Sequence, residues 1–171
     1  TYTAELSNGS ALPSCLTFYA STRTLSGTPP NSAVGTMSVK IIASDGNASV
    51  FDTFVITISN VNDGPTDIGL SSTSIDETAA ATIGKKAISH VIGTLSTTDV
   101  DPSDTHTYSL MDKTGFDNNS FIIDQEDKTL GLKSQPDFEA KSSYKVFIKS
   151  QDATGASVTK EIIISVTDKN E

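Results

Sequence analysis

Apolar and polar residues alternate along several short stretches of this chain, and turn-forming residues separate the stretches. In residues 37–43, Met37, Val39 and Ile41 alternate with mostly polar neighbours, and residues 50–59 repeat the pattern. A period of two predicts strands with one half-buried face, and no segment keeps a helical period for three turns. The strands expected are 1–6, 16–18, 24–26, 37–43, 50–59, 68–70, 75–77, 91–95, 107–110, 121–124, 129–132, 144–149 and 158–166. Many short strands separated by turns predict an all-β sandwich fold.

Two stretches of the chain repeat one another. Residues 39–63 and 146–171 both run through a strand, an aspartate, a turn of small residues, Ala-Ser-Val, a long strand and an ending of asparagine with acids. Asp45 and Asp152 hold the same place in the two copies. The repeat predicts two domains, 1–63 and 64–171, that meet at Asn60-Val61-Asn62-Asp63-Gly64-Pro65.

Composition narrows the classes of function. The chain has 171 residues with 21 acidic against 12 basic side chains, a net charge of -9, and no apolar segment long enough to span a bilayer. This charge disfavours nucleic-acid phosphates and favours cations. The single cysteine excludes an intramolecular disulfide, which fits a bacterial exterior or periplasm better than a secreted animal protein. No targeting signal is visible, so we expect a piece of a longer protein, with no membrane insertion by this piece.

Acidic side chains follow the strand ends that a sandwich brings together. Asp99 and Asp101 follow one strand and Asp152 follows another, so all three can converge on Asn62, Asp63 and the Gly64 carbonyl. Two carboxylates at about 5 Å repel by roughly 3 kcal/mol at an effective dielectric of 20. Calcium, which takes about 6 to 8 oxygen ligands from carboxylates, amides and carbonyls, would remove that cost. The pattern therefore predicts a calcium site.

These residues also form motifs that resemble those of cadherins. Asn60-Val61-Asn62-Asp63 resembles the linker motif DxND, Asp99-Val100-Asp101 the DxD, Gln151-Asp152-Ala153 the xDx and Asp137-Phe138-Glu139 the DxE. Residues 66–171 resemble a bacterial cadherin-like repeat. Residues 1–65 resemble the dystroglycan-type cadherin-like ("Putative Ig") repeat of large bacterial surface proteins. The resemblance implies two tandem Greek-key sandwiches, the first lacking its N-terminal strand, within calcium-stiffened rods.

The resemblance also implies which residues bind the ion. At the joint between the two domains the implied calcium ligands are Asn62, Asp63, Gly64, Asp99, Asp101 and Asp152. A second set would serve as a half-site for the following joint, namely Glu77, Asp137, Glu139, Asp168 and Glu171. We expect one ion, or two, at the first joint.

Other functions have less support in the sequence. Asp137 and Glu139 could instead be surface charges, or a carboxylate pair of the kind that glycoside hydrolases use, but 6% aromatic residues and no Trp offer few sugar platforms. Motifs of nucleophilic or nucleotide-dependent enzymes do not occur, so no enzyme is expected. His90 and His106 are expected at the surface or an edge, not in a zinc site.

The function expected is therefore a calcium-binding structural repeat of a bacterial cell-surface or secreted adhesin-type protein. Its partners would be neighbouring repeats of the same chain. The alternatives are a carbohydrate-binding module, with polysaccharide as the partner, or a homophilic adhesion module, with identical chains as partners.

Overall fold

The computed structural model describes residues 1–79, 81 and 90–169, and in this part of the chain the regular structure is strands with two short 3-10 turns. The all-β fold class expected from the sequence is confirmed. Among the described residues there is no helix long and apolar enough to cross a membrane. The chain divides into two compact units, unit 1 (Thr1–Val61) and unit 2 (Asn62–Glu171). The domain boundary expected between Asp63 and Gly64 stays a prediction.

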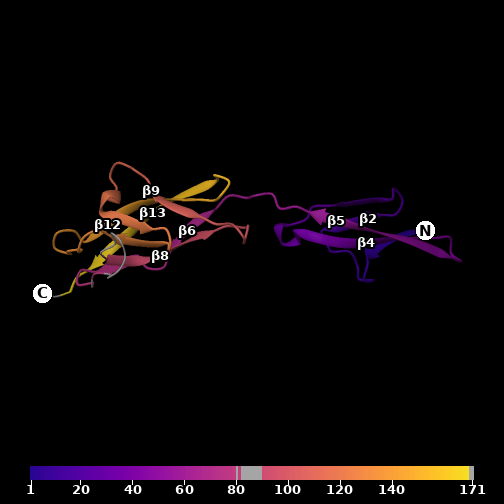
Figure 1. The fold of residues 1–171 in the computed structure, drawn as a ribbon, viewed down its shortest axis with the longest axis horizontal. Helices are drawn as coiled ribbons and strands as arrows, with labels where there is room; N and C mark the ends of the chain where they lie inside the picture. The colour runs from indigo at the N-terminus through magenta and orange to yellow at the C-terminus, as the bar shows by residue number, and fades with distance from the viewer. Residues whose placement is uncertain (80, 82–89, 170–171) are drawn as a thin grey trace. The chain divides into compact units, whose positions relative to one another are not determined.

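Unit 2 is a sandwich of two four-stranded sheets (Figure 1). One sheet has the order β10-β11-β8-β6, and the other has the order β7-β13-β12-β9. Its strands are β6 (Asp67–Leu70), β7 (Ser74–Asp76), β8 (His90–Thr98), β9 (Thr107–Leu110), β10 (Phe121–Asp124), β11 (Thr129–Leu132), β12 (Ser143–Gln151) and β13 (Ser157–Thr167). The second 3-10 turn, Asn118–Ser120, precedes β10.

Alternation along the strands builds the core of unit 2. Along β13, Ile162, Ile164 and Val166 are buried while the residues between them are exposed. They join one cluster with buried residues of the opposite sheet, among them Leu95 and Leu130. The period of two places one face of each sheet against the other, and burial of these side chains holds the two sheets together.

Unit 1 has fewer strands than unit 2 and a smaller buried core. Its strands are β1 (Tyr2–Leu6), β2 (Leu16–Tyr19), β3 (Thr24–Gly27), β4 (Gly35–Ser44) and β5 (Ser49–Ile58), with a 3-10 turn at Asn31–Ala33. A three-stranded sheet has the order β1-β4-β5, and β2 and β3 form a separate hairpin. Among the described residues of unit 1, Val39 is the only large apolar side chain that is fully buried.

The sequence repeat corresponds to a repeat in strand pairing. Val50 of β5 lies opposite Ala43 of β4, and Val158 of β13 lies opposite Ser150 of β12. β1 pairs with β4 as β9 pairs with β12, so β4 and β5 are the counterparts of β12 and β13. We expected unit 1 to lack an N-terminal strand; set beside unit 2, its described residues contain no counterpart of β6, β7 or β8.

Candidate metal centre

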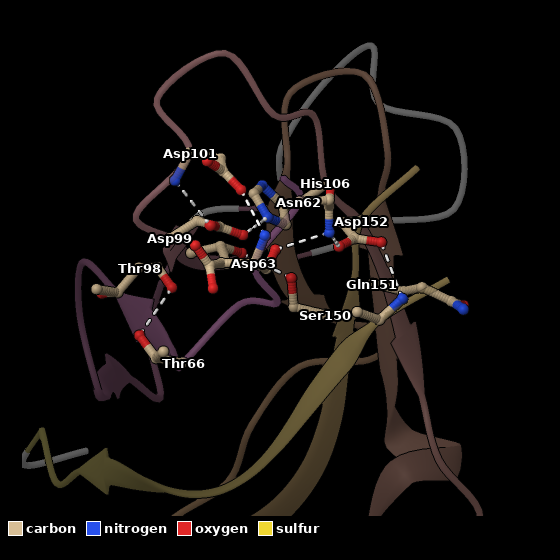
Figure 2. A network of polar contacts seen from close by, with 12 residues as sticks. Asn62, Asp63, Thr66, Thr98, Asp99, Asp101, His106, Ser150, Gln151 and Asp152 are labelled. Carbon is tan, nitrogen blue, oxygen red and sulfur yellow. Dashed lines mark hydrogen bonds and ion pairs between the residues drawn. The ribbon is translucent and has the colours of Figure 1, made fainter. Parts of the chain in front are cut away.

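The acidic residues of the expected joint site gather at one end of unit 2 (Figure 2). Asn62 and Asp63 precede β6, Asp99 and Asp101 follow β8, and Asp152 follows β12. β6 and β8 are antiparallel, with Asp67 opposite Thr98, so the start of one strand meets the end of the other. The structure therefore brings these five residues together at the place where the chain enters unit 2.

Asp152 organises both the β12–β13 turn and the chain before β6. Its side chain is buried, and Oδ1 accepts hydrogen bonds from the main-chain N of Thr154, Gly155 and Ala156 at 2.8 to 2.9 Å. Oδ2 accepts from Asn62 Nδ2 at 3.0 Å. The hydrogen bond from Asn62, followed by those of the turn, holds the pKa of Asp152 below its usual value. One carboxylate thus links the chain entry to the turn.

Asp45, the counterpart of Asp152 in unit 1, closes its own turn in the same way. Its Oδ1 accepts hydrogen bonds from the main-chain N of Asn47 at 2.9 Å and of Ala48 at 2.8 Å. These two bonds, that from Ala48 first, lower the pKa of Asp45. Closing a hairpin turn therefore accounts for the recurrence of this aspartate without any ion, and only the Oδ2 contact of Asp152 is specific to the cluster.

Asp101 and Asp99 are held by hydrogen bonds of a different kind. Asp101 is 2% exposed, and its Oδ2 accepts from Asp63 N at 2.7 Å. Asp99 accepts from Asp101 N at Oδ1 (3.0 Å) and lies 2.9 Å from His106 Nε2 through Oδ2. The bond from Asp101 N and then the contact with His106 lower the pKa of Asp99. The carboxylate of Asp99 is therefore favoured in its ionised form by fixed donors.

The pKa of Asp104 reflects its burial and the repulsion among the carboxylates at this end of unit 2. Its main-chain N donates to Asp101 O at 3.1 Å, which turns the loop back and leaves Asp104 half-buried. Burial raises the pKa of Asp104, and repulsion from Asp101, Asp99 and Asp152 raises it further, in that order. Four carboxyl groups therefore act on one another at this end of unit 2, which is a site of concentrated negative charge.

The donor set suits a hard cation. It consists of carboxylates, a side-chain amide and nearby main-chain carbonyls, the oxygen ligands that calcium takes in flexible geometry. Mutual repulsion at Asp104 is the kind of cost that a cation relieves. Within the described residues, however, no three His, Cys, Asp or Glu side chains are grouped tightly enough to hold a metal. The residues thus fit calcium in their chemistry, while their oxygens face hydrogen-bond donors of the chain itself.

Gly64 lies close to the turn that Asp152 closes. A Cβ added at Gly64 would meet Ala156 Cβ at 3.1 Å, closer than most such contacts in proteins. The next residue, Pro65, is buried, and Thr66 N donates to Thr98 O at 2.8 Å. The entry into unit 2 is therefore packed and hydrogen-bonded rather than loose.

The second predicted set lies at the opposite end of unit 2, where β7 and β13 end. Glu77 is buried; its Oε2 accepts from Phe138 N at 2.9 Å and its Oε1 accepts from Lys169 N. Asp137 Oδ1 accepts from Ala140 N at 2.9 Å. The structure thus brings Glu77 to the segments that carry Asp137, Glu139 and Asp168, whose side chains are exposed. Glu171 lies outside the described residues.

The sequence did not indicate two members of this network. His106 is half-buried against Asp99, directly before the edge strand β9. His90 is 4% exposed on the internal strand β8, with neither ring nitrogen hydrogen-bonded to a described residue, so the surface or edge placement expected for the histidines is wrong for His90. Asp104 was visible only as part of an acidic loop. The spacing Asp-x-x-Asp from Asp101 to Asp104 suits a turn and is a local signal for this placement of Asp104. The proximity of Asp104 to the other acidic side chains, however, depends on the tertiary fold.

Comparison with known proteins agrees with this architecture. Residues 1–59 match the family model described as "Putative Ig domain". No curated protein matches the chain.

Solved structures similar to this chain include cadherin and protocadherin repeats. Human protocadherin-24 EC1-2 has a TM-score of 0.63 and 20% identity, over 99% of this chain and 82% of that one. Human mucin-like protocadherin EC1-2 has a TM-score of 0.61 and 16% identity, over 97% of this chain and 84% of that one. Mouse cadherin-23 EC22-24 has a TM-score of 0.60 and 21% identity, over 100% of this chain and 55% of that one. The fold is therefore that of cadherin-like, Ig-like repeats.

Proposed function

We propose that this chain is a calcium-binding structural repeat segment of a large cell-surface or secreted adhesin-type protein, in which calcium rigidifies the joint between two tandem repeats. The observation that carries the proposal is the crowding of Asp99, Asp101 and Asp152 around Asp104 at the entry to unit 2. The extracellular setting follows from calcium, because cadherin-like modules outside cells bind it in roughly the 10⁻⁴ to 10⁻³ M range. The single cysteine and the resemblance of unit 1 to the dystroglycan-type repeat favour a bacterial source.

Asp99, Asp101 and Asp152 would hold the ion, with oxygens of Asn62, Asp63 and Gly64. Calcium would supply a charge that offsets carboxylate repulsion and a shared bond between the chain entry and the loops of unit 2. The hydrogen bonds from Asn62 to Asp152 and from Asp63 to Asp101 already bring the entry to these carboxylates without an ion. Ligation would add to these hydrogen bonds, so residues 62–64 would be held more firmly to the loops of unit 2 and would bend less.

Glu77, Asp137, Glu139 and Asp168, with Glu171, would serve a following joint in the same way. Glu77 uses both oxygens on main-chain donors, which supports a role as the organiser of these segments. Cation binding at this end would then depend on the exposed acids. Binding of polysaccharide, the other role that the sequence left open, has no observation in its favour among the residues the structure describes.

Calorimetric titration with calcium tests the proposal. Asp101→Asn keeps the shape of the side chain and removes one charge from the ligand set, so we expect calcium affinity to fall at least about tenfold, or about 1.4 kcal/mol. Asp112→Asn, at an exposed residue beyond the end of β9 remote from His106, removes the same charge away from these ligands and should leave the isotherm unchanged. Saturation at 100 times Kd should raise the free energy of unfolding of the wild type by about 2.7 kcal/mol.

An isotherm for Asp101→Asn that matches the wild type would refute the ligand set. Small-angle scattering with and without calcium tests the mechanical part separately. If calcium binds but does not narrow the distribution of interdomain distances, the site is a local support and not a joint.

A further inference from the structure

Three hydroxyl groups inside unit 2 lie next to the candidate metal centre. Ser150 is fully buried, Tyr108 is 4% exposed and Thr97 is half-buried. Thr97 Oγ1 lies 2.8 Å from Tyr108 Oη and 2.7 Å from Ser150 Oγ, so it is hydrogen-bonded to both. Thr97 and Tyr108 also line the same cavity as Asp99 and Asp101. Thr97, Tyr108 and Ser150 thus form a hydroxyl cluster beside the acidic residues.

Each member of the hydroxyl cluster is two positions away from a residue of the candidate site. The pairs are Thr97 and Asp99, Ser150 and Asp152, and Tyr108 and His106. Side chains two positions apart in an extended chain point to the same side. Along β8, β9 and β12, each hydroxyl occupies the inward-facing position of its strand that is nearest to the site. The cluster therefore marks the level at which the strands give way to the acidic loops.

Thr97 connects the two sheets of the sandwich at this level. Tyr108 of β9 lies opposite Ser150 of β12 in one sheet, whereas β8, which carries Thr97, belongs to the other sheet. The core between the sheets is a cluster of apolar side chains, to which the ring of Tyr108 also belongs. Apolar contacts have no preferred direction, whereas hydrogen bonds require a defined distance and angle. The hydroxyl of Thr97 therefore fixes the end of β8 relative to β9 and β12.

The candidate metal centre takes its residues from both sheets, so its geometry depends on how the sheets are held at this end. Asp99 and Asp101 follow β8, whereas Asp152 follows β12 in the opposite sheet. Burial and then repulsion from these acids raise the pKa of Asp104. The same repulsion pushes the end of β8 away from the end of β12, whereas calcium needs their oxygens within about 2.3–2.6 Å of one ion. Hydrogen bonds between the strands, just before they end, oppose this separation.

We propose that the hydroxyl of Thr97 is a positioning group for the cation site, which holds the end of β8 against β9 and β12 so that Asp99 and Asp101 stay close to Asp152. This inference rests on the proposed function and adds to it a residue outside the ligand set on which cation binding depends. Thr97 acts through the strand ends and does not contact the ion. A site whose acids are already held together loses less conformational freedom when the ion binds, so its affinity is higher.

Two substitutions separate the hydroxyl of Thr97 from its methyl group. Thr97→Val keeps the methyl and removes both hydrogen bonds, whereas Thr97→Ser keeps the hydroxyl and removes the methyl. In calorimetric titration of the whole chain, Thr97→Val should weaken calcium binding about threefold to tenfold, at or below the range for residues that contact metal ligands directly. Thr97→Ser should bind calcium as the wild type does. If Thr97 only fills space in the core, the order of the two variants is reversed.

Thr94→Val is the matched control, because it makes the same substitution at an exposed position of β8. It should leave the calcium isotherm unchanged. Tyr108→Phe removes only one of the two hydrogen bonds and should weaken binding in the same direction as Thr97→Val but by less. This variant decides the question if Thr97→Val does not fold, which far-UV circular dichroism shows.

Amide hydrogen exchange in EDTA tests the positioning role without calcium. Asp101 N donates to Asp99 Oδ1 and Gly155 N donates to Asp152 Oδ1, so these two amides report on the held acids. Both should exchange at least about threefold faster in Thr97→Val than in the wild type. Phe138 N, which donates to Glu77 at the opposite end of unit 2, should exchange at the same rate in both proteins.

The possible outcomes distinguish this inference from the function on which it rests. If the wild type binds calcium and Thr97→Val binds it equally well, the positioning role is overturned and the calcium site stands. The role is also overturned if Thr97→Ser is weakened as much as Thr97→Val, or if exchange at Phe138 rises as much as at Asp101, since the effect would then be a general loss of stability. A wild type that binds no calcium would overturn the proposed function and this role together.

Discussion

Glu77 allows the structural role of a predicted calcium ligand to be measured apart from the ion. Its two carboxylate oxygens accept from Phe138 N and Lys169 N, which belong to segments 61 and 92 residues away along the chain. Glu77→Ala removes both hydrogen bonds. Because Glu77 is 4% exposed, water does not readily replace the lost carboxylate at the half-buried Phe138.

The expected cost follows from the surroundings of the two donors. A buried donor left without its acceptor costs about 1–3 kcal/mol, which applies to Phe138 N. Lys169 is exposed, so its N–H can bind water at little cost. Truncation also removes the desolvation penalty of a buried carboxylate, which reduces the net effect. We therefore expect a loss of about 2 kcal/mol, or a fall of about 8–16 °C in the midpoint for a domain of this size.

Differential scanning calorimetry in EDTA measures this loss without a contribution from calcium. Glu77→Gln keeps one acceptor and should lose about half as much. Glu139→Ala removes an exposed acid of the same predicted half-site and should stay within about 0.5 kcal/mol of the wild type. If Glu77→Ala melts with the wild type in EDTA, the two hydrogen bonds contribute nothing and the structural role is refuted.

Two further predictions concern the stability of unit 2. The pKa values of Asp152 and Asp99 lie below the usual 3.8, so the stability that these carboxylates contribute is present above that value and is lost as pH falls through the folded values. Urea unfolding in EDTA should show the free energy of unfolding decreasing as pH falls below about 4, and a flat profile would contradict this. Asn118 is buried; it donates to Met111 O at 2.6 Å and Phe147 O at 2.9 Å and accepts from Phe147 N at 2.9 Å. Asn118→Ala should therefore lower the free energy of unfolding in urea by about 2–4 kcal/mol. Asn119→Ala, at an exposed neighbour, should leave it unchanged.

The sequence by itself was enough to determine the strands and the kind of chemistry at the candidate site. Alternation in residues 37–43 and 50–59 is a local property that depends on the two-residue period of a strand, and both segments are strands. The recurrence of Asp45 and Asp152 after corresponding strands also follows from local needs, because each closes its own hairpin turn. An acidic composition with one cysteine limited the candidate ligands to oxygen.

Only the tertiary structure decided which groups contact one another and which remain exposed. His106 contacts Asp99 through its ring nitrogen, and Glu77 accepts hydrogen bonds from Phe138 N and Lys169 N. These contacts form because strand ends that are distant in the sequence converge when the sheets pack. The exposure of Phe51 could not be read from its alternating pattern, which is that of an ordinary half-buried strand. Whether such a face is covered depends on strands far away in the sequence or on another molecule, and a local period of hydrophobicity carries no information about either.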